Sequence, residues 1–425
     1  MSPGELLRAL FDAAVARAQP SLVLTAYLPE PPDPAKGRTV VIGAGKASAA
    51  MACALEAAWP LQAPLSGVVV TRRGHVPHPL AHITLLEAAH PVPDADGLAA
   101  TQAVLAALQG LGPDDLVIAL MSGGGSALLA APLPDWSLAG EQDLNRQLLA
   151  CGASISEMNT IRRHLSSLKG GRLARHCRPA RLVTLAISDV PGDALADIAS
   201  GPTVPDPTTC AQALALIERY RLRVPEALLG SLKDGSLETP KPGDASWWPD
   251  DQARLIATPQ DMLQAASEAA HRLGWRAHIL SDGLEGEARE VGKVLAGIAR
   301  QVARHGQPWP GPCVLLSGGE TTVTSAGVAA GGRNRECLLS AALALRGEPG
   351  VWMLGADTDG IDGSADAAGA LITPDTLVRA RAWGLDAHGM LARHESGAFF
   401  ETLGDQVVTG PTFTNVNDFR ALLIA

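Results

Sequence analysis

A lysine lies inside a glycine turn in the segment Val41–Ser48, which reads VIGAGKAS. An apolar run ends at this turn and a helical stretch begins, and glycines together with the free N–H groups of a helix start can bind a phosphate. Lys46 would add a point positive charge, which makes it a candidate catalytic residue. The spacing Gly43-x-Gly45-x-x-Ser48 also comes close to the dinucleotide fingerprint G-x-G-x-x-G/A, and a plain tight turn is the third interpretation.

A second glycine-rich turn, SGGGS, follows the apolar run Leu116–Leu120. Three glycines between two hydroxyls form a nest of N–H donors that suits a phosphate, with a flexible turn as the alternative. A similar SGG turn follows the run Cys313–Leu316. Because ligands bind beyond the carboxyl ends of strands in open α/β sheets, we predict that both turns hold phosphate groups. The residues concerned are Ser122, Gly123, Gly124, Gly125 and Ser126, and then Ser317, Gly318, Gly319 and Glu320.

Basic side chains gather in the segment Asn159–Gly171, which reads NTIRRHLSSLKGG. Next to a bound phosphate, these positive side chains would neutralise part of its negative charge. We therefore expect Asn159, His164 and Lys169 to take part in binding, and a solvated basic helix is the alternative.

Aspartates follow two further apolar runs. Asp189 and Asp193 lie in the loop after Leu182–Ile187, and Asp357 opens an aspartate- and glycine-rich loop after Val351–Leu354. Loop carboxylates of this kind can hold Mg²⁺ on nucleotide phosphates, or one of them can accept the proton of a substrate hydroxyl. We predict all three aspartates as metal ligands and count Asp189 among the catalytic candidates as well, with turn formation as the alternative role.

The segment Gly331–Asn334, GGRN, places a guanidinium at an expected helix start. Arginine grips a carboxylate or a phosphate through two parallel hydrogen bonds. Arg333 could therefore hold a substrate acid or stabilise a transferring phosphoryl group, and Asn334 is a candidate binding residue beside it. An exposed arginine in a helix-capping loop is the alternative.

The elements that must position these turns are short apolar runs alternating with alanine- and leucine-rich helical stretches. The runs are continuous rather than alternating, which is typical of strands buried on both faces of a parallel sheet. We therefore expect an α/β fold with Rossmann-like domains and mostly parallel sheets. The expected strands are Thr39–Ile42, Gly67–Thr71, Leu116–Leu120, Leu182–Ile187, Ala277–Leu280, Cys313–Leu316 and Val351–Leu354.

The length of 425 residues is too great for one ordinary core. The stretch Gly230–Asp251, rich in Gly, Pro, Asp and Trp, is typical of a linker. We therefore expect an N-terminal Rossmann-like domain over residues 1–235 and a C-terminal α/β domain over residues 245–425.

The composition excludes several classes of protein. Hydrophobic residues make up 47% and charged residues 18%, and the net charge of -10 disfavours nonspecific binding of nucleic acid. The six cysteines show no CxxC pair, and free thiols in a reducing compartment are expected. The first twenty residues are typical of an amphipathic helix rather than a secretion signal, and no apolar run approaches a membrane span. We expect a soluble cytoplasmic protein whose sequence allows a homodimer.

Taken in order, the motifs resemble those of the glycerate 2-kinase family, whose C-terminal part is called the MOFRL domain. The resemblance covers nearly the whole chain. It rests on GAGKAS at Gly43–Ser48, HPVPD at His90–Asp94, SGGGSALL at Ser122–Leu129, RRHLSSLKGG at Arg162–Gly171, SDVPGD at Ser188–Asp193, SGPTVPD at Ser200–Asp206, SGGETTVT at Ser317–Thr324, GGRN at Gly331–Asn334, DTDGIDGSADAAGA at Asp357–Ala370 and TNVND at Thr414–Asp418.

The resemblance implies two α/β domains with an interdomain cleft, and transfer of a phosphoryl group from ATP, with Mg²⁺, to the 2-hydroxyl of D-glycerate. It places the functional lysine of the family on Lys46 and the functional arginine on Arg333, and Asn415 in the last motif is a further candidate binding residue. Arg335 stands where glutamine is expected, Phe413 replaces an expected glycine, and Ile256–Asp261 lacks the usual asparagine. These departures bear on substrate specificity rather than on the reaction class.

Two rival functions follow from the same residues. An NAD(P)H-dependent hydroxypyruvate reductase would use Gly43-x-Gly45-x-x-Ser48 for a dinucleotide and the pair Arg72 and Arg73 for a 2′-phosphate. Such an enzyme does not need two further SGG turns and so many loop aspartates. A noncatalytic sensor of a sugar acid or nucleotide is the other alternative, and no DNA-binding appendage supports it.

Overall fold

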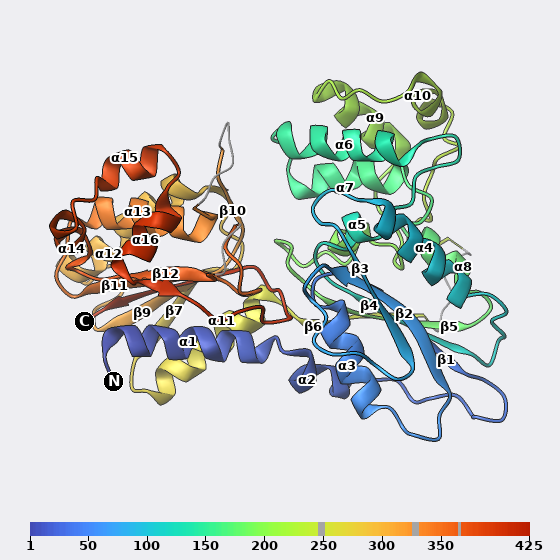
Figure 1. The fold of residues 1–425 in the computed structure, drawn as a ribbon, viewed down its shortest axis with the longest axis horizontal. Helices are drawn as coiled ribbons and strands as arrows, with labels where there is room; N and C mark the ends of the chain where they lie inside the picture. Colours follow the sequence, from blue (N-terminus) through green and yellow to red (C-terminus); the bar gives the residue numbers. More distant parts are fainter. Residues whose placement is uncertain (245–250, 325–330, 364–366) are drawn as a thin grey trace. The chain divides into compact units, whose positions relative to one another are not determined.

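The computed structural model describes residues 1–244, 251–324, 331–363 and 367–425. The chain forms two compact units (Figure 1). The N-terminal unit comprises Pro20–Ile256, and the C-terminal unit comprises Ala257–Ala425 together with Met1–Gln19. The sequence-based division assigned the first residues to the N-terminal domain, whereas their helix belongs to the other unit. The expected linker lies partly outside the described residues, since 245–250 are not among them.

The N-terminal unit is built on a six-stranded sheet in the order β3-β2-β1-β4-β5-β6. The pairings that join β3, β2, β1, β4 and β5 are all parallel, which confirms the expected α/β class with parallel strands. Ala44 at the end of β1 pairs with Val70 of β2 and Met121 of β4, so these strands end side by side. The strands are β1 Thr39–Ala44, β2 Leu65–Arg72, β3 Ile83–Ala88, β4 Leu116–Met121, β5 Arg181–Ile187 and β6 Gln252–Ala257.

Helices cover this sheet because its strands are apolar on both faces. Every residue of β1 and of β4 is buried. Helix α4 packs with Val40 and Ile42 in one core, and α3 contacts the same strands as well. Helices α6, α7, α9 and α10 share a second apolar core and form a separate helical cluster. The helices of the unit are α2 Pro20–Val23, η1 Leu24–Tyr27, α3 Ser48–Ala58, α4 Ala95–Ala107, α5 Gly125–Leu128, α6 Leu138–Ala150, α7 Ile155–His164, α8 Arg172–His176, η2 Ile198–Ser200, α9 Cys210–Arg219 and α10 Glu226–Lys233.

The C-terminal unit contains a second six-stranded sheet, in the order β13-β12-β11-β14-β9-β7. This sheet is mixed. The pairing of β7 with β9 is parallel, whereas β14 runs antiparallel to both β9 and β11. The expectation of mostly parallel strands therefore applies to the N-terminal sheet, because here the last segment of the chain inserts between two of the expected strands. The strands are β7 Arg276–Ser281, β8 Gly286–Glu287, β9 Cys313–Ser317, β10 Thr321–Thr322, β11 Val351–Asp357, β12 Gly369–Ile372, β13 Gln406–Val407 and β14 Asp418–Ile424.

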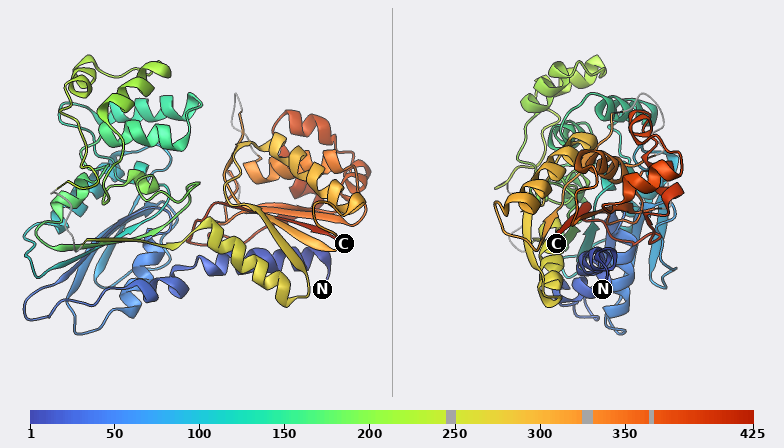
Figure 2. Two further views of the ribbon diagram at one scale, coloured as in Figure 1. Left: turned by 180° about the vertical axis from the view of Figure 1, so that it is seen from behind. Right: turned by 90° about the vertical axis from the view of Figure 1, so that its left-hand side faces the viewer.

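Two layers of helices cover the C-terminal sheet. Helices α12, α13 and α16 lie on one face, and α1 and α11 lie together on the other (Figures 1 and 2). None of the helices within the described ranges is long and apolar enough to cross a membrane. The helices are α1 Pro3–Arg17, α11 Pro259–Arg272, α12 Ala288–His305, α13 Arg333–Leu345, α14 Thr376–Ala382, α15 Ala387–Ala392 and α16 Ser396–Leu403.

Candidate active-site residues in the two units

The two glycine turns of the N-terminal unit lie against each other at the carboxyl ends of β1 and β4. A Cβ atom added to Gly45 would lie 2.0 Å from the Ser122 Oγ, so only glycine permits this approach. The backbone N–H of Ala47 donates to the same Oγ at 3.0 Å, and the Ser48 hydroxyl donates to the Leu120 carbonyl at 2.9 Å. This is the position in the strand order, between β1 and β4, at which sheets of this topology bind ligands.

The backbone N–H groups of the first turn are used inside the protein. Gly45 donates to the Val70 carbonyl at 3.2 Å, and Lys46 donates to the Gly123 carbonyl at 2.9 Å. Gly43 belongs to β1 and is paired on both sides. These contacts give Gly43 and Gly45 a packing role, and their part in binding an anion stays a prediction.

The second turn offers N–H donors for an anion. Within the part of the chain that the structure describes, the N–H groups of Gly123 and Gly124 donate to no protein acceptor. A Cβ on Gly124 would lie 3.5 Å from the Lys46 Cγ and 3.0 Å from the His90 Cδ2, so both side chains run beside this turn. Lys46 and Ser122–Ser126 therefore form one cationic, donor-rich surface. His90 also belongs to it, although the sequence indicated its motif only as part of the family resemblance.

Asp189 adds a carboxylate to the same surface. Its Oδ2 lies 1.5 Å from the position that a Cβ on Gly123 would occupy. Asp193 follows four residues later with a positive φ of 56°, a conformation that non-glycine residues rarely adopt. Both predicted metal ligands of this unit thus lie on the loop after β5, and Asp189 contacts the second glycine turn directly.

A chain of hydroxyls and amides supports this turn from the side. The Ser126 and Ser200 hydroxyls are 2.7 Å apart, and Ser200 donates to the Asn159 Oδ1 at 3.0 Å. Ala199 and Ser200 have positive φ values of 53° and 60°. Strained backbone of this kind persists only where the surroundings impose it, and it is common at functional sites. Asn159 is therefore joined to the turn through Ser200.

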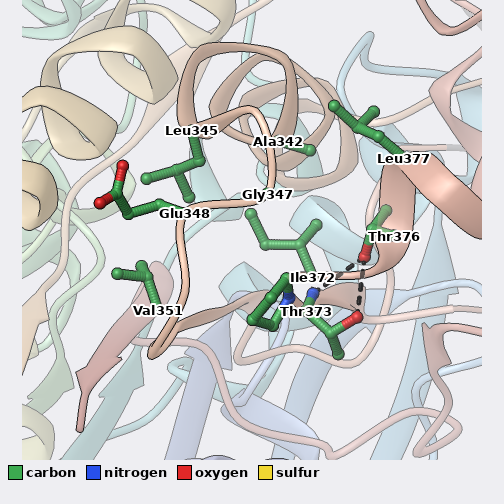
Figure 3. Close-up of a pocket in the computed structure, with 10 residues that line it drawn as sticks. Ala342, Leu345, Gly347, Glu348, Val351, Ile372, Thr373, Thr376 and Leu377 are labelled. Carbon is green, nitrogen blue, oxygen red and sulfur yellow. Dashed lines mark hydrogen bonds between the residues drawn. The ribbon is translucent and has the colours of Figure 1, made fainter.

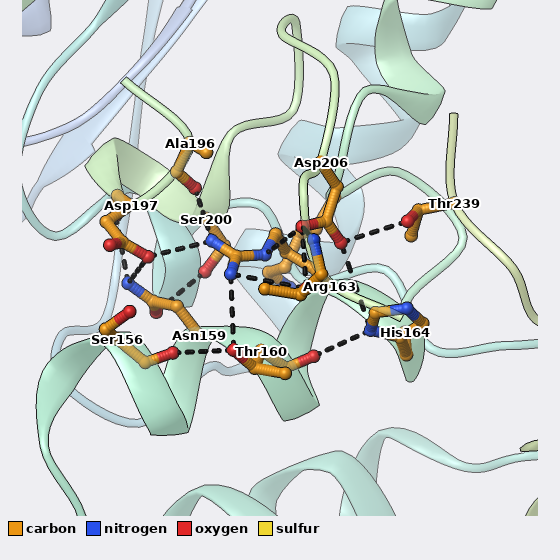
Figure 4. Close-up of polar contacts among 12 residues, drawn as sticks. Ser156, Asn159, Thr160, Arg163, His164, Ala196, Asp197, Ser200, Asp206 and Thr239 are labelled. Carbon is orange, nitrogen blue, oxygen red and sulfur yellow. Dashed lines mark hydrogen bonds and ion pairs between the residues drawn. The ribbon is translucent and has the colours of Figure 1, made fainter. Parts of the chain in front are cut away.

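The other two predicted basic residues take part in buried networks instead. The Lys169 Nζ lies 3.1 Å from the Glu141 Oε1 and donates to the Leu129 carbonyl at 3.1 Å. The His164 Nδ1 lies 2.8 Å from the Thr160 carbonyl oxygen. Figure 4 shows His164 in a polar network around Arg163 that extends to Asp206. Neither Lys169 nor His164 contacts the glycine turns among the described hydrogen bonds and ion pairs, and their part in binding phosphate stays a prediction.

Arg333 is the centre of charge in the C-terminal unit. Its three guanidinium nitrogens bond to the carboxylates of Asp418 at 2.9 Å, Glu320 at 2.6 Å and Asp357 at 3.0 Å. Burial alone would lower the pKa of Arg333, but these carboxylates raise it well above its ordinary value. The sheet register supplies the arrangement, because Asp357 of β11 pairs directly with Asp418 of β14.

The start of α13, which carries Arg333, is capped by Asp362. Its two carboxylate oxygens accept from the backbone N–H groups of Asn334 and Arg335, each at 3.0 Å. The Arg335 guanidinium bonds to the same carboxylate at 3.1 Å, and both side chains are buried. Arg335, which departs from the glutamine expected from the family resemblance, thus has its own charge partner. The Asn334 amide donates to Asp418 at 2.7 Å and helps to hold that carboxylate against Arg333.

The SGG turn of this unit is also closely packed. A Cβ on Gly319 would lie 2.2 Å from the Leu284 backbone nitrogen, and the Gly318 N–H donates to the Ser281 carbonyl at 2.8 Å. The Glu320 carboxylate forms an ion pair with Arg333. The Ser317 Oγ is buried and has no hydrogen-bond partner among the described residues. Asn415 is buried, and its side-chain oxygen accepts from the Asn417 N–H at 3.2 Å.

A small pocket lies elsewhere in this unit, between the end of α13, β12 and the start of α14 (Figure 3). Leu345, Ile372 and Leu377 line it. Its polar groups are satisfied locally, since the Thr373 N–H donates to the Thr376 hydroxyl at 2.9 Å. No predicted site residue lines this pocket, and we assign it no role.

Comparison with known proteins finds relatives that match nearly the whole length of the chain. Residues 6–233 match a family described as a domain of unknown function (DUF4147), and residues 313–418 match the MOFRL family. A D-glycerate 2-kinase of Thermotoga maritima is 40% identical over 91% of this chain and 91% of its own length. A crystal structure of glycerate kinase from the same organism superposes with a TM-score of 0.84 at 37% identity, covering 99% of each chain. A protein of Agrobacterium vitis provisionally named hydroxypyruvate reductase is 54% identical over 100% of this chain and 95% of its own.

The fold and these matches define an α/β enzyme of the kinase class. The chain belongs to the glycerate kinase family, with an N-terminal DUF4147 region and a C-terminal MOFRL region.

Proposed function

We propose that this kinase transfers the γ-phosphoryl group of ATP to the 2-hydroxyl of D-glycerate, giving 2-phosphoglycerate and ADP. The observation that carries the proposal is the surface at the end of β4, where the Lys46 side chain runs beside Gly124 and the Lys46 backbone bonds to Gly123. Phosphoryl transfer requires chiefly positioning and charge stabilisation from the protein, and this surface supplies donors and a cation.

In this proposal the Gly123–Gly124 nest holds phosphate oxygens, and Lys46 neutralises their charge. Arg333 supplies a second permanent cation in the C-terminal unit, for a substrate carboxylate or for the phosphoryl group. Its three carboxylate partners fix the direction of its side chain, and Glu320 is the most exposed of them, at 46%. An aspartate accepts the proton of the attacking hydroxyl, and Asp189 is the candidate closest to the nest.

A magnesium ion fits the donor chemistry of this region. Mg²⁺ takes oxygen ligands and is usually bound by one or two carboxylates together with substrate phosphates. Asp189 presents an oxygen against the nest, and Asp193 lies on the same loop after the buried strand β5. Asp357, the last residue of β11, is a further candidate in the C-terminal unit. When bound, the ion would neutralise charge on the nucleotide phosphates.

A reductase is the second candidate, because the N-terminal sheet has the strand order of dinucleotide-binding folds and a close relative carries that name. Two contacts weigh against it. The N–H groups of Gly45 and Lys46, which a pyrophosphate would need, donate to protein carbonyls. Arg73, the proposed ligand of a 2′-phosphate, is bonded to Asp94 at 2.6 Å and to Asp96.

A paired assay tests the two candidates. Purified protein is incubated with D-glycerate, ATP and Mg²⁺, and separately with hydroxypyruvate and NADH or NADPH. We expect ADP release that requires glycerate, with 2-phosphoglycerate identified by its conversion by enolase, and no oxidation of the nicotinamide. Oxidation of NAD(P)H without ADP release would overturn the kinase proposal.

Comparing a substitution of Lys46 with one of a lysine outside the proposed site tests whether Lys46 itself is required for catalysis. We expect Lys46→Ala to lower kcat at least about a hundredfold, the scale of losing one preorganised charge-stabilising group. Lys36→Ala removes an exposed lysine of the same unit and should leave kcat unchanged. Near-normal turnover of Lys46→Ala would show that the proposed arrangement is incorrect.

A further inference from the structure

Three side chains with metal-binding atoms meet in the helical cluster of the N-terminal unit. They are His164 at the end of α7, Cys210 at the start of α9 and Glu238 in the loop after α10. One ligand atom of each lies within 4.8 Å of those of the other two. His164 and Cys210 are buried, whereas the Glu238 side chain is 39% exposed and opens the cluster to solvent.

The orientation of the His164 ring is that of a metal ligand. Its Nδ1 lies 2.8 Å from the Thr160 carbonyl oxygen, which can only accept, so this nitrogen carries the proton. In the neutral ring the Nε2 therefore presents a lone pair, and it lies 3.1 Å from the Glu238 Oε1. Two acceptors at this distance require a cation between or beside them, which can be a proton, a metal ion or the ammonium group of Lys241. A ring N–H donated to a backbone carbonyl is the usual support of a metal-bound histidine.

The carboxylate and the thiol are also held in place. The second oxygen of Glu238 accepts from the Cys210 backbone N–H at 3.1 Å, which fixes the carboxylate beside the cysteine. Asp206 ties the surrounding segments together, because it bonds to Arg163 at 3.0 Å and to the Thr239 hydroxyl at 3.0 Å (Figure 4). Backbone N–H groups thus position the Glu238 carboxylate, since its Oε1 also accepts from the Thr239 N–H at 3.1 Å.

We propose that His164, Cys210 and Glu238 form a binding site for a divalent transition-metal ion, with Zn²⁺ the best match. Imidazole, thiolate and carboxylate are the ligand types of zinc sites, whereas Mg²⁺ and Ca²⁺ select oxygen donors. Cys210 binds as the thiolate, so its proton leaves to solvent when the metal enters. A water molecule on the exposed side of Glu238 would complete four ligands. The ion would join α7, α9 and the loop after α10, which makes its role structural and independent of the proposed phosphoryl transfer.

Lys241 is the competitor for this site. Its Nζ lies 2.5 Å from the Glu238 Oε1 and supplies a positive charge where the metal would bind. The same ammonium bonds to the Thr239 hydroxyl at 2.5 Å, so it has another acceptor to which it can turn. Replacing this side chain by an uncharged one should therefore strengthen metal binding.

Cobalt titration of the full-length protein tests the site. After removal of metals with a chelator, Co²⁺ is added, and we expect one equivalent to give the near-ultraviolet charge-transfer band of a thiolate–cobalt bond. Zn²⁺ should abolish the band, and Mg²⁺ should not. Cys210→Ser should lose the band, whereas Cys177→Ser, which removes another buried thiol of the same unit, should keep it. A missing band in the native protein, or a band that survives in Cys210→Ser, would overturn the proposal.

Two further variants guard against a folding defect in Cys210→Ser. Glu238→Gln changes the most exposed ligand, and we expect its affinity for Zn²⁺ to fall at least tenfold in competition with a chromogenic chelator. Lys241→Met should raise that affinity severalfold. Unchanged affinity in both variants would place the cobalt thiolate elsewhere and contradict the assignment. Since the readout is metal binding, it is independent of whether the kinase assay succeeds.

Discussion

Gly123 lies so close to the Asp189 carboxylate that any larger residue at this position would disturb the nest of N–H donors. A methyl group here would have to occupy the space of the Asp189 carboxylate, 1.5 Å from its Oδ2. We expect Gly123→Ala to displace that carboxylate, to distort the nest and to lower kcat about a hundredfold or more, as misplacement of a reacting group by about 1 Å does. Steady-state kinetics with glycerate and ATP measure the loss.

A matched glycine shows whether the effect belongs to the site. Gly230 lies in α10, and a Cβ on it would meet nothing within 4 Å. Gly230→Ala should keep kcat and raise the free energy of unfolding by about 0.5–1 kcal/mol, because alanine favours a helix. Equal kcat values for the two variants would show that the Gly123 contact has no catalytic consequence.

Buried thiols give a residue-scale prediction about reactivity. Burial raises the pKa of Cys177 to about 12 and that of Cys337 to about 11. Since the thiolate is the reactive form, these raised pKa values keep both thiols protonated at pH 8 and slow their reaction. We expect neither to react with a disulfide reagent at pH 8 in the native protein, and both to react in urea. Peptide mass spectrometry identifies the labelled cysteines, and labelling of Cys177 at native conditions would contradict its burial.

At the scale of elements, the cap of α13 connects stability to the position of Arg333. Asp362→Ala would leave two backbone N–H groups at the helix start without an acceptor and would strand the buried Arg335 guanidinium. Breaking a buried ion pair by removing one partner costs about 3–5 kcal/mol. We expect a loss of this size in urea unfolding of the C-terminal unit, together with reduced kcat because Arg333 lies in the same first turn.

The cap of α15 provides the comparison. Asp386 accepts from the Gly389 N–H at 3.0 Å on an exposed helix, without a buried ion pair. Asp386→Ala should cost about 1 kcal/mol, the usual value of an N-cap, and should leave kcat unchanged. Similar losses in the two variants would mean that the Asp362–Arg335 pair adds nothing beyond capping.

The strands show how far sequence patterns predict these elements. Continuous apolar runs such as Thr39–Ile42 and Leu116–Leu120 correspond to β1 and β4, because a strand buried on both faces has no polar alternation. Strand β14 did not stand out, because Arg420 interrupts its apolar run. That arginine is tolerated in a buried strand because it bonds to Asp418 and Thr321. Thr321 is 99 positions away in the sequence, so local patterns do not reveal this partner.

The same limit applies to the site residues, because local patterns show the residue types but not their distant partners. Lys46 and Ser122–Ser126 each follow a continuous apolar run, and they lie together in the structure since parallel neighbours end at one edge of a sheet. For His164 and Lys169 the sequence showed positive charge but not the partners, Glu238 and Glu141, which are 74 and 28 positions away. A basic segment is therefore ambiguous between a ligand site and a buried network until long-range contacts are known.

At the scale of the whole molecule, the N-terminal helix is separated in sequence from the unit it stabilises. An amphipathic stripe on α1 predicts that the helix is buried against something, but the stripe does not say against what. In the structure Leu7, Leu10 and Phe11 are fully buried, and the Phe11 and Phe419 rings are 5.7 Å apart. Because Phe419 belongs to β14, the first turns of the chain complete the core of its last strand.

This arrangement predicts where a mutation near the N-terminus will act. Phe11→Ala should destabilise the C-terminal unit by about 3–5 kcal/mol, the usual cost of removing a buried phenylalanine side chain. Hydrogen exchange followed by mass spectrometry should show faster exchange in β11 and β14 and unchanged exchange in β1 and β4, since those strands belong to the other compact unit. Leu22→Ala, on an exposed residue of α2, should alter neither set. Faster exchange in β1 and β4 to the same degree would mean that the chain unfolds as one cooperative body, and the division into two units would then have no energetic meaning.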